Sequence, residues 1–116
     1  MSMKATVRHV DSVMVVDLKG RITIGEACKQ LREIIRQELA KDHKNLLLNL
    51  ADVTYIDSSG IGELVSAYTA VSNQGGQLKL LNLTKKVHDL LQITKLYTVF
   101  DIHNDEANAI SSFAVA

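Results

Sequence analysis

The segment Asp57–Gly62, which reads DSSGIG, holds the residues whose types and spacing could do chemistry. It follows an apolar run and precedes a helical pattern, so it stands where a strand leads into a helix. Open α/β sheets usually bind ligands at that edge. Asp57 or Ser58 can accept hydrogen bonds from the first helical turn, while Gly60 and Gly62 permit close approach of another group. A helix cap with close helix packing explains the same residues, and both interpretations stay open.

Enzymatic interpretations of this segment fail on spacing. Its glycines and Ser58 resemble a phosphate cradle, but they match neither Gly-x-x-x-x-Gly-Lys nor Gly-x-Gly-x-x-Gly. Ser58 lacks the Gly-x-Ser-x-Gly context of a nucleophile elbow, and none of the four histidines is placed by sequence to act as its base. Cys28 lies on the apolar stripe of a predicted helix and is expected in the core. We therefore expect no catalytic residue, no metal site and no cofactor.

Composition excludes further classes of function. The 116 residues leave room for one domain, expected over 1–116, with 47% hydrophobic and 22% charged residues as in ordinary globular proteins. Thirteen basic and thirteen acidic residues cancel, which removes the electrostatic signature of nucleic-acid binding. The single cysteine fits a reducing compartment, and neither a signal peptide nor a membrane-spanning run is seen. We expect a cytoplasmic protein that binds no nucleic acid and inserts in no membrane.

Two β-branched runs, 6–10 and 13–18, predict an N-terminal hairpin whose second strand stops at Lys19-Gly20. Thr23 and Glu26 then have the spacing of a capping box. Apolar residues at three- and four-residue intervals predict an amphipathic helix over about 26–41. Its polar face is interpreted as a solvated surface, with Lys29, Arg32, Glu33 and Arg36.

The rest of the chain alternates strands and helices. The expected elements are a strand at 46–50, a helix from near Ser59 to Gly75-Gly76, a strand at 78–83, a helix capped by Thr84, a short strand at 99–102 and a helix opened by Asp105. Leu47-Leu48-Asn49-Leu50 resembles Leu80-Leu81-Asn82-Leu83, which we interpret as two parallel strands of one strand-helix-strand unit. The order predicts an α/β fold: a mostly parallel sheet of about five strands, an N-terminal antiparallel hairpin and about four flanking helices.

A family resemblance extends over almost the whole chain, and Asp57–Gly60 is its most specific part. The chain resembles a STAS domain of the bacterial anti-sigma factor antagonist (anti-anti-sigma factor) family. The residues that carry the likeness are Leu48-Asn49-Leu50, Val53, Tyr55-Ile56-Asp57-Ser58-Ser59-Gly60-Ile61-Gly62, Gly75-Gly76, Leu91, Leu96-Tyr97 and Phe100. The resemblance implies the STAS fold, a sheet flanked by helices.

The resemblance also implies a function in transcription regulation by partner switching. Such a protein binds a serine kinase of the GHKL ATPase type that otherwise holds a sigma factor, and this binding frees the sigma factor. The kinase is implied to phosphorylate Ser58, and a PP2C-type phosphatase to reverse the step. The protein is expected to be a monomer or weak homodimer. The implied partner-binding residues are Arg21, Thr23, Asp57, Ser58, Ser59, Gly60, Ile61 and Gly62.

Two positions depart from the family pattern. Relatives often carry Gly-Glu-hydrophobic-Asp after the second strand, whereas this chain has Gly20-Arg21-Ile22-Thr23, which reverses a charge on the implied binding face. Lys95 replaces a glycine common before the late Leu-aromatic pair. Two other functions stay open: a constitutive subunit of a stressosome or ABC-type lipid transport system, with Ser58 only as a helix cap, and a small-ligand or nucleotide-binding module using 58–62.

Overall fold

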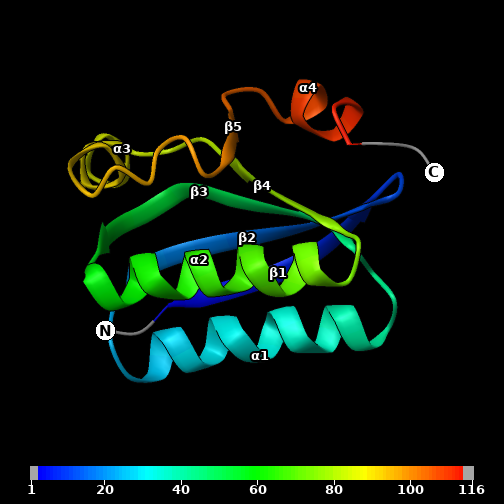
Figure 1. The fold of residues 1–116 in the computed structure, drawn as a ribbon, viewed down its shortest axis with the longest axis horizontal. Coiled ribbons are helices and arrows are strands. Elements are labelled where there is room, and N and C mark those ends of the chain that lie inside the picture. Colours follow the sequence, from blue (N-terminus) through cyan, green and yellow to red (C-terminus); the bar gives the residue numbers. More distant parts are fainter. Residues whose placement is uncertain (1–2, 114–116) are drawn as a thin grey trace.

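A five-stranded sheet in the order β1-β2-β3-β4-β5 forms the centre of the computed structural model, which describes residues 3–113 (Figure 1). β1 pairs with β2 in antiparallel fashion, and all later pairs are parallel. This arrangement confirms the predicted fold class. The elements in chain order are β1 (Lys4–Val10), β2 (Val13–Ile22), α1 (Glu26–Ala40), β3 (Asn45–Ile56), α2 (Ser58–Asn73), β4 (Gln77–Leu81), α3 (Lys85–Ile93), β5 (Asp101–His103) and α4 (Glu106–Ser111).

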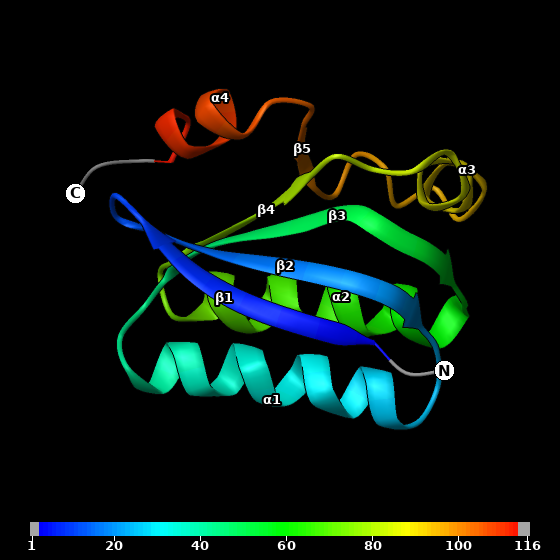
Figure 2. The same cartoon turned by 180° about the vertical axis from the view of Figure 1, so that it is seen from behind.

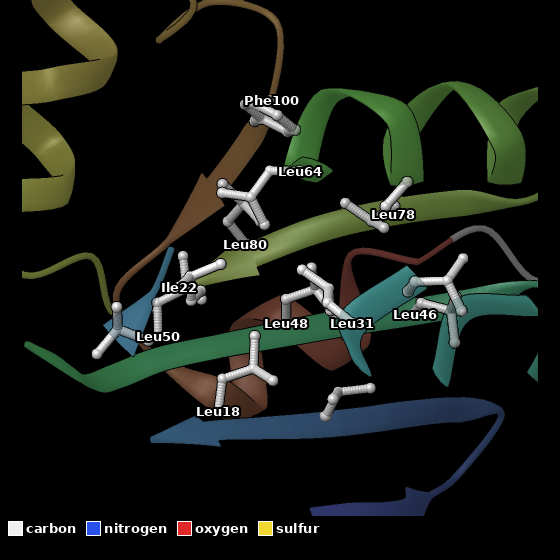
Figure 3. Close-up of a cluster of buried hydrophobic side chains, with 14 of the residues drawn as sticks. Leu18, Ile22, Leu31, Leu46, Leu48, Leu50, Leu64, Leu78, Leu80 and Phe100 are labelled. Carbon is white, nitrogen blue, oxygen red and sulfur yellow. The ribbon is translucent and has the colours of Figure 1, made fainter. Parts of the chain in front are cut away.

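The helices form layers on the two sides of the sheet. α1 and α2 lie side by side beneath it, and α3 and α4 lie on the other side, at opposite ends of the molecule (Figures 1 and 2). The main core fills the space between the sheet and α1 and α2, where Leu18, Leu31, Leu48, Leu64 and Leu80 are buried (Figure 3). A smaller cluster lies under α4 and comprises Val13, Val15, Leu47, Leu81, Ala109 and Phe113.

Both faces of β3 are covered along its first half, which explains its nearly continuous apolar run. Leu46 and Leu48 belong to the main core, while Leu47 belongs to the cluster under α4. Leu48 lies opposite Leu80 in the parallel β3–β4 ladder, so the two similar leucine-rich segments are neighbouring strands of one strand-helix-strand unit, as predicted. Among residues 3–113 we find no helix with the length and apolar character needed to cross a bilayer.

Two local predictions at the end of β2 are wrong. The strand does not stop at Lys19-Gly20 but continues to Ile22, with register shifts against β3 on both sides of this pair. Gly20 adopts a positive φ of 104°, so it marks an irregularity inside the strand. The predicted capping box is not formed either, because the N-cap of α1 is Gly25, which has no side chain to cap with.

The parallel pairing of β2 and β3 brings two loops together. Ile22 and Ile56, the last residues of the two strands, face each other in the ladder. The β2–α1 loop and the start of α2 therefore leave the sheet at the same edge, which is the edge that the sequence predicted for a functional site.

Candidate functional site

Asp57 joins the two loops at this edge. Its Oδ1 accepts a hydrogen bond from the backbone N–H of Gly60 at 2.8 Å, which makes it the N-cap of α2. Its Oδ2 accepts a second bond from the backbone N–H of Ile24, in the β2–α1 loop, at 3.0 Å. Its own N–H donates to the carbonyl of Ile22 at 3.3 Å. One carboxylate thus fixes both segments relative to each other.

The contacts of Asp57 also set its charge. Partial burial raises the pKa of the carboxyl group, but the hydrogen bonds from the N–H groups of Gly60 and Ile24 outweigh this effect. The pKa of Asp57 therefore lies below its ordinary value, and the group is ionised at neutral pH. The positive end of the α2 dipole favours the same state.

The two glycines of the segment have different roles. A Cβ added at Gly60 would lie 2.2 Å from the carbonyl oxygen of Ile22 and 2.6 Å from Cγ1 of Ile56, so the start of α2 can approach the strand ends only with glycine here. A Cβ at Gly62 would meet nothing within 4 Å. Gly60 is therefore required by packing, whereas Gly62 leaves the outer surface of α2 bare.

The two serines differ in accessibility. Ser58 is the first residue of α2 and is exposed. Ser59 is half-buried and borders a hollow of about 580 Å³ between α1 and α2. Within residues 3–113, neither hydroxyl takes part in a side-chain hydrogen bond. Ser58 thus presents an accessible hydroxyl on a backbone that Asp57 holds in place.

The other predicted site residues fall into exposed and buried groups. Arg21 is exposed and its guanidinium carbon lies 4.7 Å from the centroid of the Tyr55 ring, to which it is paired across β2 and β3. Thr23 is half-buried. Gly60 and Ile61 are buried, and Ile61 packs in the main core, so these two residues shape the surface from beneath.

Sequence reasoning missed an ion pair that joins α1 and α2 beside the site. Glu63 is buried, and its Oε1 accepts a hydrogen bond from Nη2 of Arg32 at 2.7 Å. Arg32 was predicted to be part of a solvated face. The position of Glu63 between the inward-facing Ile61 and Leu64 is the signal that could have revealed a buried carboxylate in need of a cation.

A metal centre has no support at this edge or elsewhere in residues 3–113, where no three or more histidine, cysteine, aspartate or glutamate side chains gather closely enough to hold an ion. The side chains at this edge of the sheet include the Ser58 hydroxyl, the Asp57 carboxylate that caps α2, and the Arg21 and Tyr55 side chains that contact each other. Arginine and tyrosine are among the residue types enriched at protein interfaces.

Comparisons with known proteins show which proteins this chain resembles. The chain is 32% identical over 102 residues to the anti-sigma-B factor antagonist of Bacillus subtilis, covering 88% of this chain and 92% of that protein. It is 25% identical over 118 residues to the anti-sigma F factor antagonist of Paenibacillus polymyxa, covering 99% and 98%.

Among solved structures, the fold is similar to that of SpoIIAA, a Bacillus cell fate determinant, in its phosphorylated form. The TM-score is 0.74 at 21% identity, covering 93% of this chain and 97% of that chain. For the unphosphorylated form of the anti-sigma factor antagonist SpoIIAA the TM-score is 0.71 at 20% identity, covering 93% and 96%. The STAS domain family matches residues 4–109, and the chain therefore belongs to the STAS domain family, as its sequence predicted.

Proposed function

We propose that this protein is an anti-sigma factor antagonist, which binds an anti-sigma factor and so releases a sigma factor. The names of these two relatives, which are among several similar proteins, support this role. The observation that carries the proposal is the exposed Ser58 hydroxyl, which stands on a backbone fixed by the Asp57 bonds to Gly60 and Ile24. The protein acts in the cytoplasm as a binding module with no catalytic activity of its own.

The anti-sigma factor in this proposal is a serine kinase of the GHKL type. Unphosphorylated protein sequesters the kinase, the kinase phosphorylates Ser58, and a PP2C-type phosphatase restores the free hydroxyl. SpoIIAA, whose fold this chain shares, is known in a phosphorylated and an unphosphorylated form, which supports a phosphorylation switch on this scaffold. Exposure at the first residue of α2 gives a kinase access to Ser58 but not equally to Ser59.

The docking surface combines the exposed Arg21 and the neighbouring Thr23 with the segment Asp57–Gly62. The hydrogen bond between Ile24 and Asp57 supports this assignment because it holds the two segments side by side. Buried Gly60 and Ile61 contribute by setting the backbone, while Ser58 and the bare surface at Gly62 face outward.

Electrostatics explains how phosphorylation switches the surface. A phosphate on Ser58 adds about −1.5 to −2 charges at a helix N-terminus, where the dipole tolerates an anion, so the fold survives. Asp57 already places one negative charge beside it. In a complex the phosphate has to lose its water, and an uncompensated buried charge costs several kcal/mol. Since about 1.4 kcal/mol changes affinity tenfold, no change of shape is needed to release the kinase.

Phosphopeptide mapping tests the proposal. The purified protein is incubated with ATP and each recombinant GHKL kinase of the source cell, and the modified peptide is sequenced by mass spectrometry. We expect phosphate on Ser58, none in Ser58→Ala and unchanged incorporation in the matched control Ser59→Ala. Phosphate on Ser59 would refute the site. No phosphate with any of these kinases, together with stable copurification of an ABC ATPase, would favour a constitutive subunit.

A further inference from the structure

Two cations flank an exposed aromatic ring beside the proposed docking surface. The guanidinium carbon of Arg21 lies 4.7 Å from the centroid of the Tyr55 ring, and Nζ of Lys86 lies 5.9 Å from it. Tyr55 is 38% exposed, and Ile24, three residues after Arg21 in the sequence, is 76% exposed. We refer to Arg21, Tyr55 and Lys86 as the cationic patch. Its residues come from β2, β3 and α3, so it extends beyond the two loops that carry the other site residues.

The patch belongs to the same end of the molecule as Ser58. The starts of α1 and α2 and the whole of α3 lie at this end in both views of the fold (Figures 1 and 2). Tyr55 precedes Ser58 by three residues, and Arg21 faces Tyr55 in the ladder next to the pair formed by Ile22 and Ile56. The patch and Ser58 therefore lie at one end of the molecule, where one partner of protein size can reach both.

The cations of the patch are not neutralised within the fold. In the part of the chain that the structure describes, neither Arg21 nor Lys86 has a carboxylate within 4.0 Å, whereas Lys85, the neighbour of Lys86, pairs with Asp89 at 3.1 Å. Contact with the Tyr55 ring attracts each cation weakly and leaves its charge available to a partner. Exposed arginine and tyrosine next to an exposed isoleucine are also typical of protein interfaces.

We propose that the cationic patch selects a partner whose docking face is acidic, with carboxylates against Arg21 and Lys86 and apolar atoms against Tyr55. This inference rests on the proposed function, because the partner is the kinase that reads Ser58. Complementary charge raises the rate of encounter and disfavours partners with a basic face.

The same charges account for the direction of the switch. The cationic patch and Asp57 together carry a net charge of about +1, which attracts an acidic face. A phosphate on Ser58 adds about −1.5 to −2, which reverses the sign of the combined charge of the patch, Asp57 and Ser58. An acidic partner is then repelled by the group that its own kinase activity has installed. A basic partner would be drawn more strongly to the phosphorylated form, which is the opposite of release.

The test measures kinase affinity by calorimetry for Arg21→Glu, Lys86→Glu and the double variant, using the recombinant kinase that phosphorylates the protein. Arg36→Glu is the matched control, because Arg36 is an exposed arginine near the other end of α1. Each patch variant is expected to bind on the order of tenfold more weakly at 0.1 M salt, with the difference shrinking at high salt, while the control changes less than twofold. Thermal unfolding of each variant checks that the fold is retained.

Several outcomes overturn the proposal. A double variant that binds as tightly as wild type, or more tightly, shows that the partner face is not acidic, while release by Ser58 phosphorylation would still uphold the proposed function. If no kinase binds the wild-type protein, both proposals fail. Sedimentation of wild type, but not of the double variant, with vesicles containing phosphatidylserine would assign the patch to an anionic lipid surface instead.

Discussion

The cations that fasten α4 differ from the two cations of the cationic patch at the other end of the molecule. At the α4 end, Arg8 bonds to Asp17 and also to Glu106 at 2.7 Å. Lys79, only 8% exposed, pairs with Asp101 at 2.9 Å and donates to the carbonyl of Ser112. At the end that carries Ser58, the cations of Arg21 and Lys86 have no carboxylate partner among residues 3–113.

This difference separates what holds the fold from what is available for binding. At the α4 end, side chains bond to one another and fasten α4 to the sheet. At the Ser58 end the Asp57 carboxylate, the close packing of Gly60 and the Arg32–Glu63 pair hold the loops and helices, while Ser58, Arg21 and the Tyr55 ring remain at the surface. We expect substitutions at the α4 end to change stability, and outward-facing substitutions at the Ser58 end to change binding.

The largest effect is expected where the Ser58 end depends on backbone contact. Gly60→Ala forces a Cβ against the Ile22 carbonyl and should lower the free energy of unfolding by about 3 kcal/mol. Gly62→Ala is the matched control within the same helix, and the added methyl group meets nothing. It should raise stability by about 0.5–1 kcal/mol. Urea unfolding measures both, and equal effects of the two variants would contradict the packing role of Gly60.

An intermediate effect is expected from the buried cation at the α4 end. Lys79→Met leaves the Ser112 carbonyl without its donor and removes the contact with the Phe113 ring. It should reduce stability by about 1–2 kcal/mol and speed hydrogen exchange in α4. Kinase affinity should not change.

The exposed Lys95 provides the control for that substitution, since Lys95→Met should stay within about 0.5 kcal/mol of wild type. A loss of kinase affinity in Lys79→Met without a loss of stability would remove the distinction between the two ends.

A smaller effect is expected in the acid dependence of stability. The hydrogen bonds from Arg8 lower the pKa of Asp17 and of Glu106. In the unfolded chain these groups take up protons near their ordinary values, about 3.9 and 4.3, before the folded protein does. Their contribution to stability is therefore complete above those values, begins to fall as the pH drops below them, and is lost only below the lower pKa values of the folded protein.

Replacing Arg8 should remove that contribution. Melting temperatures of wild type and Arg8→Met, measured from pH 7 to pH 3, should differ most at neutral pH, and the difference should shrink steadily as the pH falls below about 4. If the melting temperatures of the two proteins differ by the same amount at every pH in this range, the pairing of Arg8 with Asp17 and Glu106 does not contribute to the acid dependence of stability.

Local patterns predicted much of the fold. The predicted caps at Thr84 and Asp105 are present, because a short polar side chain before an apolar helical pattern bonds to the nearby N–H of Val87 or Asn108. The order of the elements and the α/β class also followed from periodicity. These features depend on residues a few positions apart in the chain.

Features that depend on distant residues were not predictable in the same way. Thr23 and Glu26 had the spacing of a capping box, but the loop is instead held by a bond from Ile24 to Asp57, 33 residues later. The pairing of Arg32 with Glu63 and the approach of Lys86 to Tyr55 likewise join separate elements. The identity of the site segment was visible in the sequence, whereas the charges around it required the fold.

The affinity of the kinase for Ser58-phosphorylated and unphosphorylated protein, measured side by side, tests the central claim most directly. A complete switch from mostly bound to mostly free corresponds to a difference of about 10⁴-fold, or about 5.5 kcal/mol. Our account predicts a loss that approaches this size while the melting temperature stays nearly constant, because the phosphate changes the docking surface and leaves the fold intact. Equal affinities of the two forms would contradict it.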